Sequence, residues 1–471
     1  MNILNIDKII ISLFPIIFII NSFLFNHKLF LYTTSLMIFI IFYELIIYNK
    51  KEVFGFSGIN LMSFPSIILV TFTIFISIPS IYICYLYNFN QYTTPYFISI
   101  LFFYIFYPLG LQFGIKIKNI ELNKLINMKY EKIDDSNLFK INYELLVILL
   151  SICIFIIANY LMKVNEIPLF ELIKNPGDYA RLALLREQAL KTLGLSTIEK
   201  YLFIWVRSLF LPFGIVGSLF LADNIKKRKY WFLFWSFLII GLFINSITLE
   251  KSPIATIFLI LTVYYYIKKN KLNIGTIFIY SIIIISIPFT ISYFLHYGKN
   301  GALEIVINSL MYRIFIIPSE VLYQYFYIFP DIHDFLLGRS SQIFSWFHYD
   351  GTFPLSNYVA RVWWNDPTTS GSCNANYIGN FWADFGLIGV FISTFFIGLI
   401  THLFYFKLLI ASEFKKNFLY VCSTAVVIPI FTFGFFSSNF TTLFLTRGLI
   451  LLYFIFILFN NLNIKYNRTI K

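Results

Sequence analysis

Charged residues are scarce in this chain. Asp, Glu, Lys and Arg make up 13% of its 471 residues, whereas a soluble domain carries roughly 25%. Hydrophobic residues make up 59%, and the mean hydropathy is +0.76. This balance excludes an ordinary soluble protein and predicts an all-α, polytopic membrane protein.

Cysteine is also sparse. The chain has 4 cysteines and no CxxC pair, so neither a zinc site nor a disulfide framework is predicted. The sequence shows no nucleotide-binding motif and no cluster of metal ligands, and we expect no cofactor, no metal and no nucleic-acid partner. No small-residue cleavage site follows the first apolar run, so that run is predicted to remain as a membrane span.

Apolar runs long enough to cross a bilayer recur along nearly the whole chain, which is therefore predicted to be one membrane domain, residues 1–471. A spanning helix needs about 20 apolar residues. The sequence predicts about twelve spans, near residues 9–25, 29–48, 61–87, 94–115, 144–163, 201–222, 230–249, 253–267, 274–295, 377–406, 418–436 and 441–460.

Lysine and arginine predict how these spans are oriented, because basic loops stay in the cytoplasm. Every second connection is basic: Lys50-Lys51, the 116–143 loop, residues 226–229, residues 268–271 and Lys415-Lys416. Twelve spans place all of these, and both termini, in the cytoplasm. Two long connections, 164–200 and 296–376, are then on the outer side, where we expect function to concentrate.

The first outer region holds cations that depart from the positive-inside rule. In NPGDYARLALLREQALKTLG, Asp178 is placed to cap a helix whose apolar face includes Leu182 and Leu185. Arg186 projects from the middle of that face, and Arg181 lies at its edge. Two interpretations are open: an interfacial helix whose arginines reach lipid headgroups, or arginines that meet a phosphate at membrane level.

Lys251 lies in a comparable position at the outer end of the eighth span. It precedes Ser252, a suitable helix cap, and Pro253, a suitable first helical residue. Helix N-termini bind anions. Lys251 is therefore a candidate phosphate ligand, with an ordinary interface lysine as the alternative.

The second outer region opens with GALEIVINSLMYRIFIIPSEVLYQYFYIF, two short apolar segments broken at Pro318. Ser319 is predicted to cap the second helix, with Glu320 in its first turn. Such interrupted segments are typical of a partly embedded hairpin that lines a cavity. Arg313 is the strongest candidate for anion binding, and a structural pair with Glu304 or Glu320 is the alternative.

Residues 331–376 mix aromatic side chains with acids, amides and small residues. Aromatic faces beside carboxylates and amides suit carbohydrate, and a loop packed on the membrane surface by its tryptophans is the alternative. The candidate glycan-binding residues are Trp346, Arg361, Trp363 and Trp364.

A polar line then enters the tenth span. Asn376, Asn380 and Asp384 recur every four residues and so share one helix face. A separate stripe of small residues, suited to close helix packing, consists of Gly379, Ala383 and Gly386. Asp384 is therefore predicted to face the bundle rather than lipid, and we expect it to hold the aromatic loop over a cavity.

The run NANYIGNFWADFGLIGV, after a long aromatic outer loop near the C-terminus, resembles the Wzy-type oligosaccharide repeat unit polymerases, which build O-antigen and capsule. LEKSPIATIFLILTVYYY and DYARLALLREQ are similar to stretches of the same family. At residue level the likeness is confined to these stretches. The layout of about twelve spans with two main outer loops is also shared.

This resemblance implies a glycosyltransferase at the outer face of the bacterial inner membrane. It implies transfer of an oligosaccharide from undecaprenyl diphosphate to a hydroxyl of a second lipid-linked glycan, alongside a flippase and a chain-length regulator. A diphosphate leaving group needs fixed cations, and the candidates are Arg181, Arg186, Lys251 and Arg313. The candidate bases for the attacking hydroxyl are Glu320, His348 and Asp350.

Two other functions fit parts of this pattern. O-antigen ligases have the same general plan and use a different acceptor. A lipid-linked oligosaccharide flippase or other transporter is expected to carry charged residues deep in several spans and often a repeat of its halves. In this sequence the polar residues gather at one face and no repeat is evident, which favours chemistry at the surface.

Overall fold

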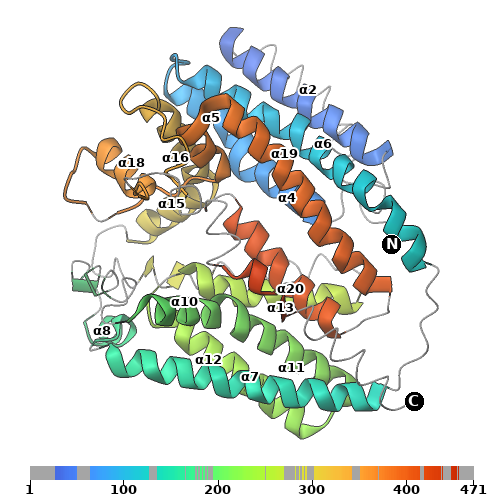
Figure 1. Cartoon of the computed structure of the whole chain (residues 1–471). Helices are drawn as coiled ribbons and strands as arrows, with labels where there is room; N and C mark the ends of the chain where they lie inside the picture. Colours follow the sequence, from blue (N-terminus) through green and yellow to red (C-terminus); the bar gives the residue numbers. More distant parts are fainter. Residues whose placement is uncertain are drawn as a thin grey trace. The chain divides into compact units, whose positions relative to one another are not determined.

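The fold is known from a computed structural model, in which every described element is a helix (Figure 1). The structure describes residues 27–49, 64–126, 135–164, 166–175, 195–249, 251–269, 302–341, 351–369, 371–413 and 418–435, with isolated positions at 178–188, 282–293 and 438–455. Two compact units divide the chain: unit 1 is Met1–Lys129, Met311–Ile410 and Phe431–Thr441, and unit 2 is Tyr130–Leu310, Ala411–Ile430 and Thr442–Lys471. Each unit joins segments that are distant in sequence, so the division does not follow a linker. One membrane domain stays a prediction.

Within the described ranges, six helical stretches are long and apolar enough to cross a membrane: Pro65–Leu86, Thr93–Gly114, Asn142–Lys163, Thr197–Ile225, Arg228–Ser246 and Tyr377–Leu403. Each coincides with a predicted span. Shorter apolar helices at three further predicted spans are His27–Ile41, Pro253–Tyr265 and Val421–Ile430. The predicted spans at 9–25, 274–295 and 441–460 lie wholly or largely outside the described residues. An all-helical, membrane-embedded protein is confirmed, and the count of twelve spans stays a prediction.

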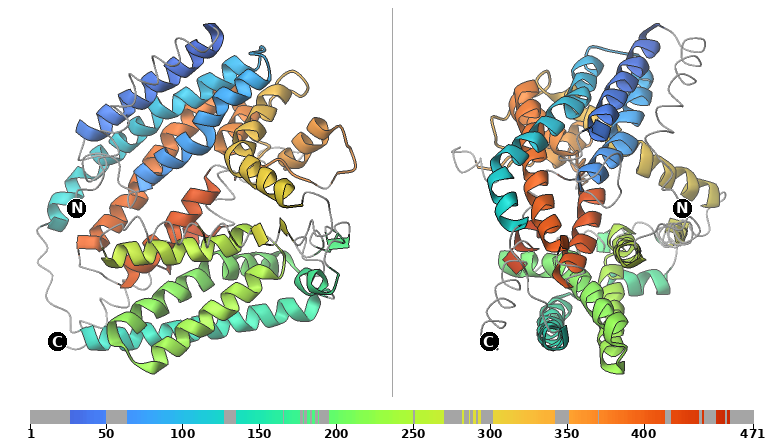
Figure 2. Two further views of the ribbon diagram at one scale, coloured as in Figure 1. Left: turned by 180° about the vertical axis from the view of Figure 1, so that it is seen from behind. Right: turned by 90° about the vertical axis from the view of Figure 1, so that its right-hand side faces the viewer.

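Unit 1 sets its long helices side by side (Figures 1 and 2). Its elements are α2 (His27–Asn49), α4 (Phe64–Phe72), η1 (Thr73–Ser77), α5 (Ile78–Leu86), α6 (Thr93–Ile126), α16 (Ile317–Ile328), α18 (Leu355–Trp364) and most of α19 (Tyr377–Glu413). Helix α2 contacts α5 and α6, and α16 contacts α5, α6, η1 and α18. Helix α16 therefore connects four other elements of this unit.

Helices α6 and α19 approach each other at two glycines. A β-carbon on Gly110 would collide with the backbone of Phe395, and one on Gly398 would collide with the backbone of Tyr107. Small residues that let backbones approach are the usual basis of helix association in membranes, where lipid removes the hydrophobic driving force.

Element η1 is a π-helical turn between α4 and α5. The Tyr104 hydroxyl of α6 lies 2.9 Å from the Thr73 hydroxyl and donates to the Ser77 hydroxyl at 2.9 Å. One phenol thus connects the first and the last residue of the turn.

Helices α15 (Ala302–Phe315) and α16 meet at a bend of 59°. The predicted pair of interrupted helices is present, but the prediction that Ser319 caps the second one is wrong. The residue before α16 is Ile316, which makes no side-chain cap, because Pro318 suits the first turn of a helix and leaves the break ahead of it. The Ser319 hydroxyl instead donates to the Ile76 carbonyl oxygen at 2.9 Å.

Helix α19 is interrupted at Gly386, where φ is 61° and ψ is −149°. Only glycine adopts this backbone conformation readily. Beside the interruption, the carbonyl oxygens of Ala383 and Asp384 accept the backbone N–H groups of Leu336 and Leu337 at 2.9 and 3.0 Å. The helix is thereby joined to the loop that follows α16.

The predicted 116–143 loop is largely helical. Helix α6 continues to Ile126, and α7 begins at Asp135. Charges end a membrane span but do not end a helix, and residues 115–126 contain neither glycine nor proline. The cytoplasmic position of this connection stays a prediction.

Unit 2 contains α7 (Asp135–Lys163), α8 (Pro168–Lys174), α10 (Thr197–Trp205), η2 (Val206–Phe210), α11 (Leu211–Ile225), α12 (Arg228–Ser246), α13 (Lys251–Lys269), and most of α15 and of α20 (Phe418–Gly434). Helix α11 contacts α7, α12 and α13. Its glycines accept bulky neighbours, since a β-carbon on Gly214 would collide with the Phe237 ring.

Candidate functional site

One end of unit 1 brings the 87–92 turn together with residues of the predicted outer region 296–376. Three hydrogen bonds join the two segments: Tyr87 to Glu320 at 3.2 Å, Asn90 to Tyr323 at 2.7 Å, and Gln91 to Asp331 at 3.3 Å. The charge pattern predicts an outer position for each segment independently. The contacts agree with that pattern, because they require both segments to lie at the same end of the helices.

Glu320 lies in the first turn of α16, as the sequence predicts, with its carboxylate held by two phenols. Tyr312 donates to Oε2 at 2.9 Å, and Tyr87 donates to Oε1 at 3.2 Å. Burial, and then the negative charge of Glu320, raise the pKa of Tyr87, so its hydroxyl stays protonated and remains a donor. Because Tyr312 belongs to the last turn of α15, its bond to Glu320 crosses the bend between the two helices.

An aromatic wall of Tyr87, Tyr323, Tyr327 and Trp363 stands beside this carboxylate. Tyr87 stacks on Tyr323 at 4.4 Å between ring centroids. The indole of Trp363 meets Tyr87, Tyr323 and Tyr327 edge-on at 5.9, 6.3 and 5.6 Å. Trp363, a predicted glycan ligand, thus packs into a wall built by three separate segments.

Two other predicted glycan ligands lie on the same helix, α18, and are exposed. Trp364 packs on Gly371, where a β-carbon would collide with the indole. Arg361 lies one turn before it on the helix surface. Both are accessible to a ligand, whereas Trp346 lies outside the described residues.

Arg313 is exposed on the last turn of α15. In the part of the chain that the structure describes, it makes neither an ion pair nor a hydrogen bond. The alternative of a structural pair with Glu304 or Glu320 therefore has no support there. The helix around it exposes apolar side chains, including Leu303, Ile307 and Met311.

Arg181, in unit 2, is engaged by two carboxylates. Its guanidinium lies 3.3 Å from Glu171 and 3.8 Å from Glu166, and its side chain is half exposed. A phosphate would have to displace these partners. The Asp178 side chain accepts the Arg181 backbone N–H at 3.2 Å, which confirms the predicted cap.

The predicted apolar face of this segment is also present. Leu182 and Leu185 are buried, and Leu182 packs with Leu172 and Leu249. Arg186 lies outside the described residues. Lys251 opens α13, but its side chain lies outside the described residues as well.

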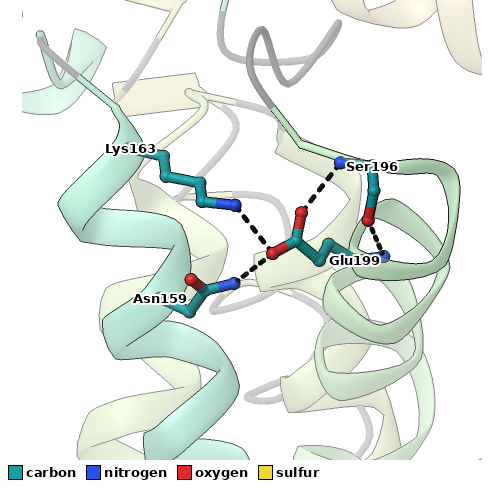
Figure 3. Close-up of polar contacts among 4 residues, drawn as sticks. All are labelled: Asn159, Lys163, Ser196 and Glu199. Carbon is teal, nitrogen blue, oxygen red and sulfur yellow. Dashed lines mark hydrogen bonds and ion pairs between the residues drawn. The ribbon is translucent and has the colours of Figure 1, made fainter.

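Unit 2 contains a polar cluster that the predicted site does not include (Figure 3). Glu199 accepts Asn159 at 2.9 Å and Lys163 at 2.7 Å from α7, and the Ser196 backbone N–H at 2.8 Å. Ser196 and Glu199 form a reciprocal capping box at the start of α10. The Ser-x-x-Glu spacing was the available signal for it.

Asp384 is buried and accepts two hydrogen bonds from one residue of the aromatic loop. The Ser340 backbone N–H reaches Oδ1 at 3.1 Å, and the Ser340 hydroxyl reaches Oδ2 at 2.5 Å. Asn380 is buried too. Asn376 departs from the predicted helix face, because it precedes α19 and its Oδ1 accepts the Ile378 N–H at 3.0 Å, as a cap does.

The predicted stripe of small residues does serve close packing. A β-carbon on Gly379 would lie 3.1 Å from the Tyr325 ring of α16, and one on Gly386 would lie 3.1 Å from the Phe335 ring. Ala383 is fully buried. The stripe therefore fits α19 against α16 and the loop that follows it.

Glu320 is the one candidate base within the described residues, since His348 and Asp350 lie outside them. No family model, no curated protein and no solved structure matches the chain. The function is accordingly argued from the residues and their geometry.

Proposed function

We propose that this chain is a bacterial polysaccharide polymerase that acts at the outer face of the inner membrane. The donor is an oligosaccharide on undecaprenyl diphosphate, and the acceptor is a second lipid-linked glycan. A hydroxyl oxygen of the acceptor's terminal sugar attacks the anomeric carbon of the donor. The bond from that carbon to the phosphate oxygen breaks, undecaprenyl diphosphate leaves, and a protein base takes the hydroxyl proton.

The observation that carries this proposal is that an exposed cation and a fixed carboxylate lie on the two sides of the α15–α16 bend. Arg313, exposed and without an ion-pair partner among the described residues, ends one helix. Glu320, held by two phenols, begins the other. A fixed cation for a leaving diphosphate and a carboxylate for a hydroxyl proton are the two groups that this transfer requires.

The side of the membrane follows from charge. If the bent pair crossed the bilayer completely, the sides of all later connections would be exchanged, and Lys415-Lys416 would face outward. A helix pair that enters the bilayer and returns to the same side keeps every basic connection in the cytoplasm. The bend of 59° fits such a pair and a broken span equally, so the charge pattern is what supports the twelve-span topology and an outward-facing site.

The other candidate phosphate ligands differ in whether a carboxylate already neutralises them. Arg186 and Lys251 stay predicted phosphate ligands. Arg181 is a weaker candidate, because Glu171 and Glu166 already neutralise it. We therefore expect the order of importance to be Arg313 and Arg186 first, then Lys251, then Arg181.

The test is transfer by the purified full-length protein in lipid nanodiscs. The substrate is the lipid-linked repeat unit isolated from cells that lack this gene. We expect a ladder of longer glycans and release of one undecaprenyl diphosphate per bond formed. Arg313→Ala should lower the rate by about 10²–10³, as loss of one oxyanion donor does, and Arg313→Lys should recover little at a bidentate site.

The matched control is Arg228→Ala, an exposed arginine on α12 that the charge pattern places in the cytoplasm. It should polymerise at the wild-type rate. A wild-type protein that releases no undecaprenyl diphosphate from the lipid-linked unit would contradict the proposal. Transfer to an O-antigen ligase acceptor, with none to the lipid-linked unit, would replace it with the ligase.

A further inference from the structure

Gln324 is a polar residue that the fold buries without satisfying. Its side chain is 4% exposed, and within the described part of the chain its Oε1 atom has no hydrogen-bond partner. A buried acceptor that is left unpaired destabilises the fold, because it has lost its hydrogen bonds to water. An amide kept at such a cost is expected to meet a partner that the free protein does not contain.

Gln324 lies one helical turn after Glu320 on α16. Residues four apart occupy the same helix face, and helical side chains lean toward the N-terminus. The Gln324 amide is therefore expected to extend toward the Glu320 carboxylate. The two residues form a short row of acceptors along one face of the helix.

Cys373 lies in the segment that precedes α19. Its carbonyl oxygen accepts the Tyr325 hydroxyl at 2.7 Å, which ties the loop to α16. Burial, and then the negative charge of Glu320, raise the pKa of the Cys373 thiol to about 11.

The chemistry of this row selects its ligand. A carboxylate and an amide oxygen both accept, so the ligand must donate at least two hydrogen bonds with a spacing of about one helical turn. In the adjoining wall, Tyr327 is exposed and Tyr87 and Trp363 are partly exposed, so these three rings offer aromatic surface, whereas Tyr323 is buried behind them. The Tyr87 hydroxyl offers a further polar contact. A sugar ring combines several hydroxyl donors with an apolar C–H face in this way.

We propose that the row of Glu320 and Gln324, with the wall of Tyr87 and Trp363, is the subsite for the terminal sugar of the acceptor glycan. This rests on the proposed function. Glu320 takes the proton of the attacking hydroxyl, and Gln324 accepts a hydrogen bond from a second hydroxyl and so sets which hydroxyl attacks. Tyr87 and Tyr312 are positioning residues that fix the carboxylate.

The probe is the repeat-unit oligosaccharide freed from its lipid by mild acid. It contains no diphosphate, so it reports the acceptor subsite alone. Binding to the full-length protein in nanodiscs is measured by tryptophan fluorescence, with Trp363→Phe expected to lose most of the signal. Gln324→Leu should raise the Kd by about threefold to tenfold, the value of one hydrogen bond.

Stability distinguishes a ligand contact from a structural one. Because Oε1 has no hydrogen-bond partner among the described residues, Gln324→Leu should unfold at the same or a higher temperature than the wild type. In the transfer assay it should raise KM for the acceptor with little change in kcat, whereas Glu320→Gln should lower kcat by about 10²–10⁴. The matched control is Gln112→Leu, a half-buried glutamine on α6 that contributes to none of these contacts, which should bind like the wild type.

Three outcomes would overturn the subsite: wild-type affinity in Gln324→Leu, a lowered unfolding temperature with proportionate loss of kcat, or an equal fluorescence change with choline, which would indicate an ammonium ligand. Polymerisation by a wild-type protein that does not bind the free oligosaccharide would also overturn it while leaving the function intact. Binding without polymerisation would support the subsite and contradict the function.

Discussion

The contact between Asp384 and Ser340 allows a structural role to be separated from a chemical one. Asp384→Leu removes both acceptors of the Ser340 N–H and hydroxyl. A hydrogen bond to an ionised group contributes about 1.5–3 kcal/mol, so the loss is about 3–6 kcal/mol at most. That is a large part of the total stability of about 5–15 kcal/mol typical of a folded domain.

Asp384→Asn is the more informative change. The amide keeps the shape of the side chain and one carbonyl oxygen, which suffices for the Ser340 backbone N–H. It loses the charge that strengthens the hydroxyl contact, at a cost of about 1–2 kcal/mol. If the residue holds the loop, Asp384→Asn retains partial polymerisation and unfolds at a modestly lower temperature.

Ser340→Ala completes a double-mutant cycle. It deletes the hydroxyl contact and keeps the backbone one. The losses in the free energy of unfolding caused by Ser340→Ala and Asp384→Asn, added together, should therefore differ from the loss in the double mutant by about 1 kcal/mol or more. The measurements are thermal unfolding of the purified protein and polymer made from the lipid-linked unit. An Asp384→Asn protein that is fully stable yet 10²–10⁴-fold slower would refute the argument, because that is the signature of a general base.

Three further predictions follow from features described above. Gly386→Ala should lower the unfolding temperature, because its backbone conformation costs a residue with a β-carbon about 1–3 kcal/mol; an unchanged temperature would show that α19 runs straight there. A variant that keeps Cys373 alone should be alkylated by iodoacetamide about tenfold faster per pH unit from 7 to 10, since its pKa is about 11; Glu320→Gln should lower that pKa and speed the reaction. An impermeant thiol reagent in intact cells should label a cysteine at position 350 and not one at position 135; the reverse result would overturn the topology.

Hydropathy was sufficient to find the six long apolar helices of the described residues, because a run of about 20 apolar residues can be recognised without knowing what packs against it. Local capping signals were also readable, as at Asp178. The cap assigned to Ser319 failed because a neighbouring segment took its hydroxyl: Ile76 lies 243 positions away in sequence. Local sequence rules do not take account of hydrogen-bond partners that are distant in sequence and come close only when the chain folds.

The residues of the candidate site could be predicted only where a local sequence pattern marks them. Glu320 and Trp363 were recognisable as candidates, but Tyr87 and Asn90 were not, because they end a span and form a turn with no chemical pattern of their own. Their contacts to α16 each join residues 233 positions apart. The pairing of Arg181 with Glu171 was likewise hidden, since the stretch between them contains a proline-glycine break that sequence periodicity does not cross.

Because of the π-helical turn η1, the third predicted span should tolerate the deletion of a residue within the turn better than a deletion elsewhere. In an α-helix each residue turns the chain by about 100° and advances it by about 1.5 Å. Removing one residue from α5 would therefore rotate its outer end and carry Tyr87 away from Glu320. Removing one from residues 73–77 would convert the wide turn into an ordinary one and leave both flanking helices in phase. Relatives of this chain that are one residue shorter in this span are expected to have lost that residue within the turn.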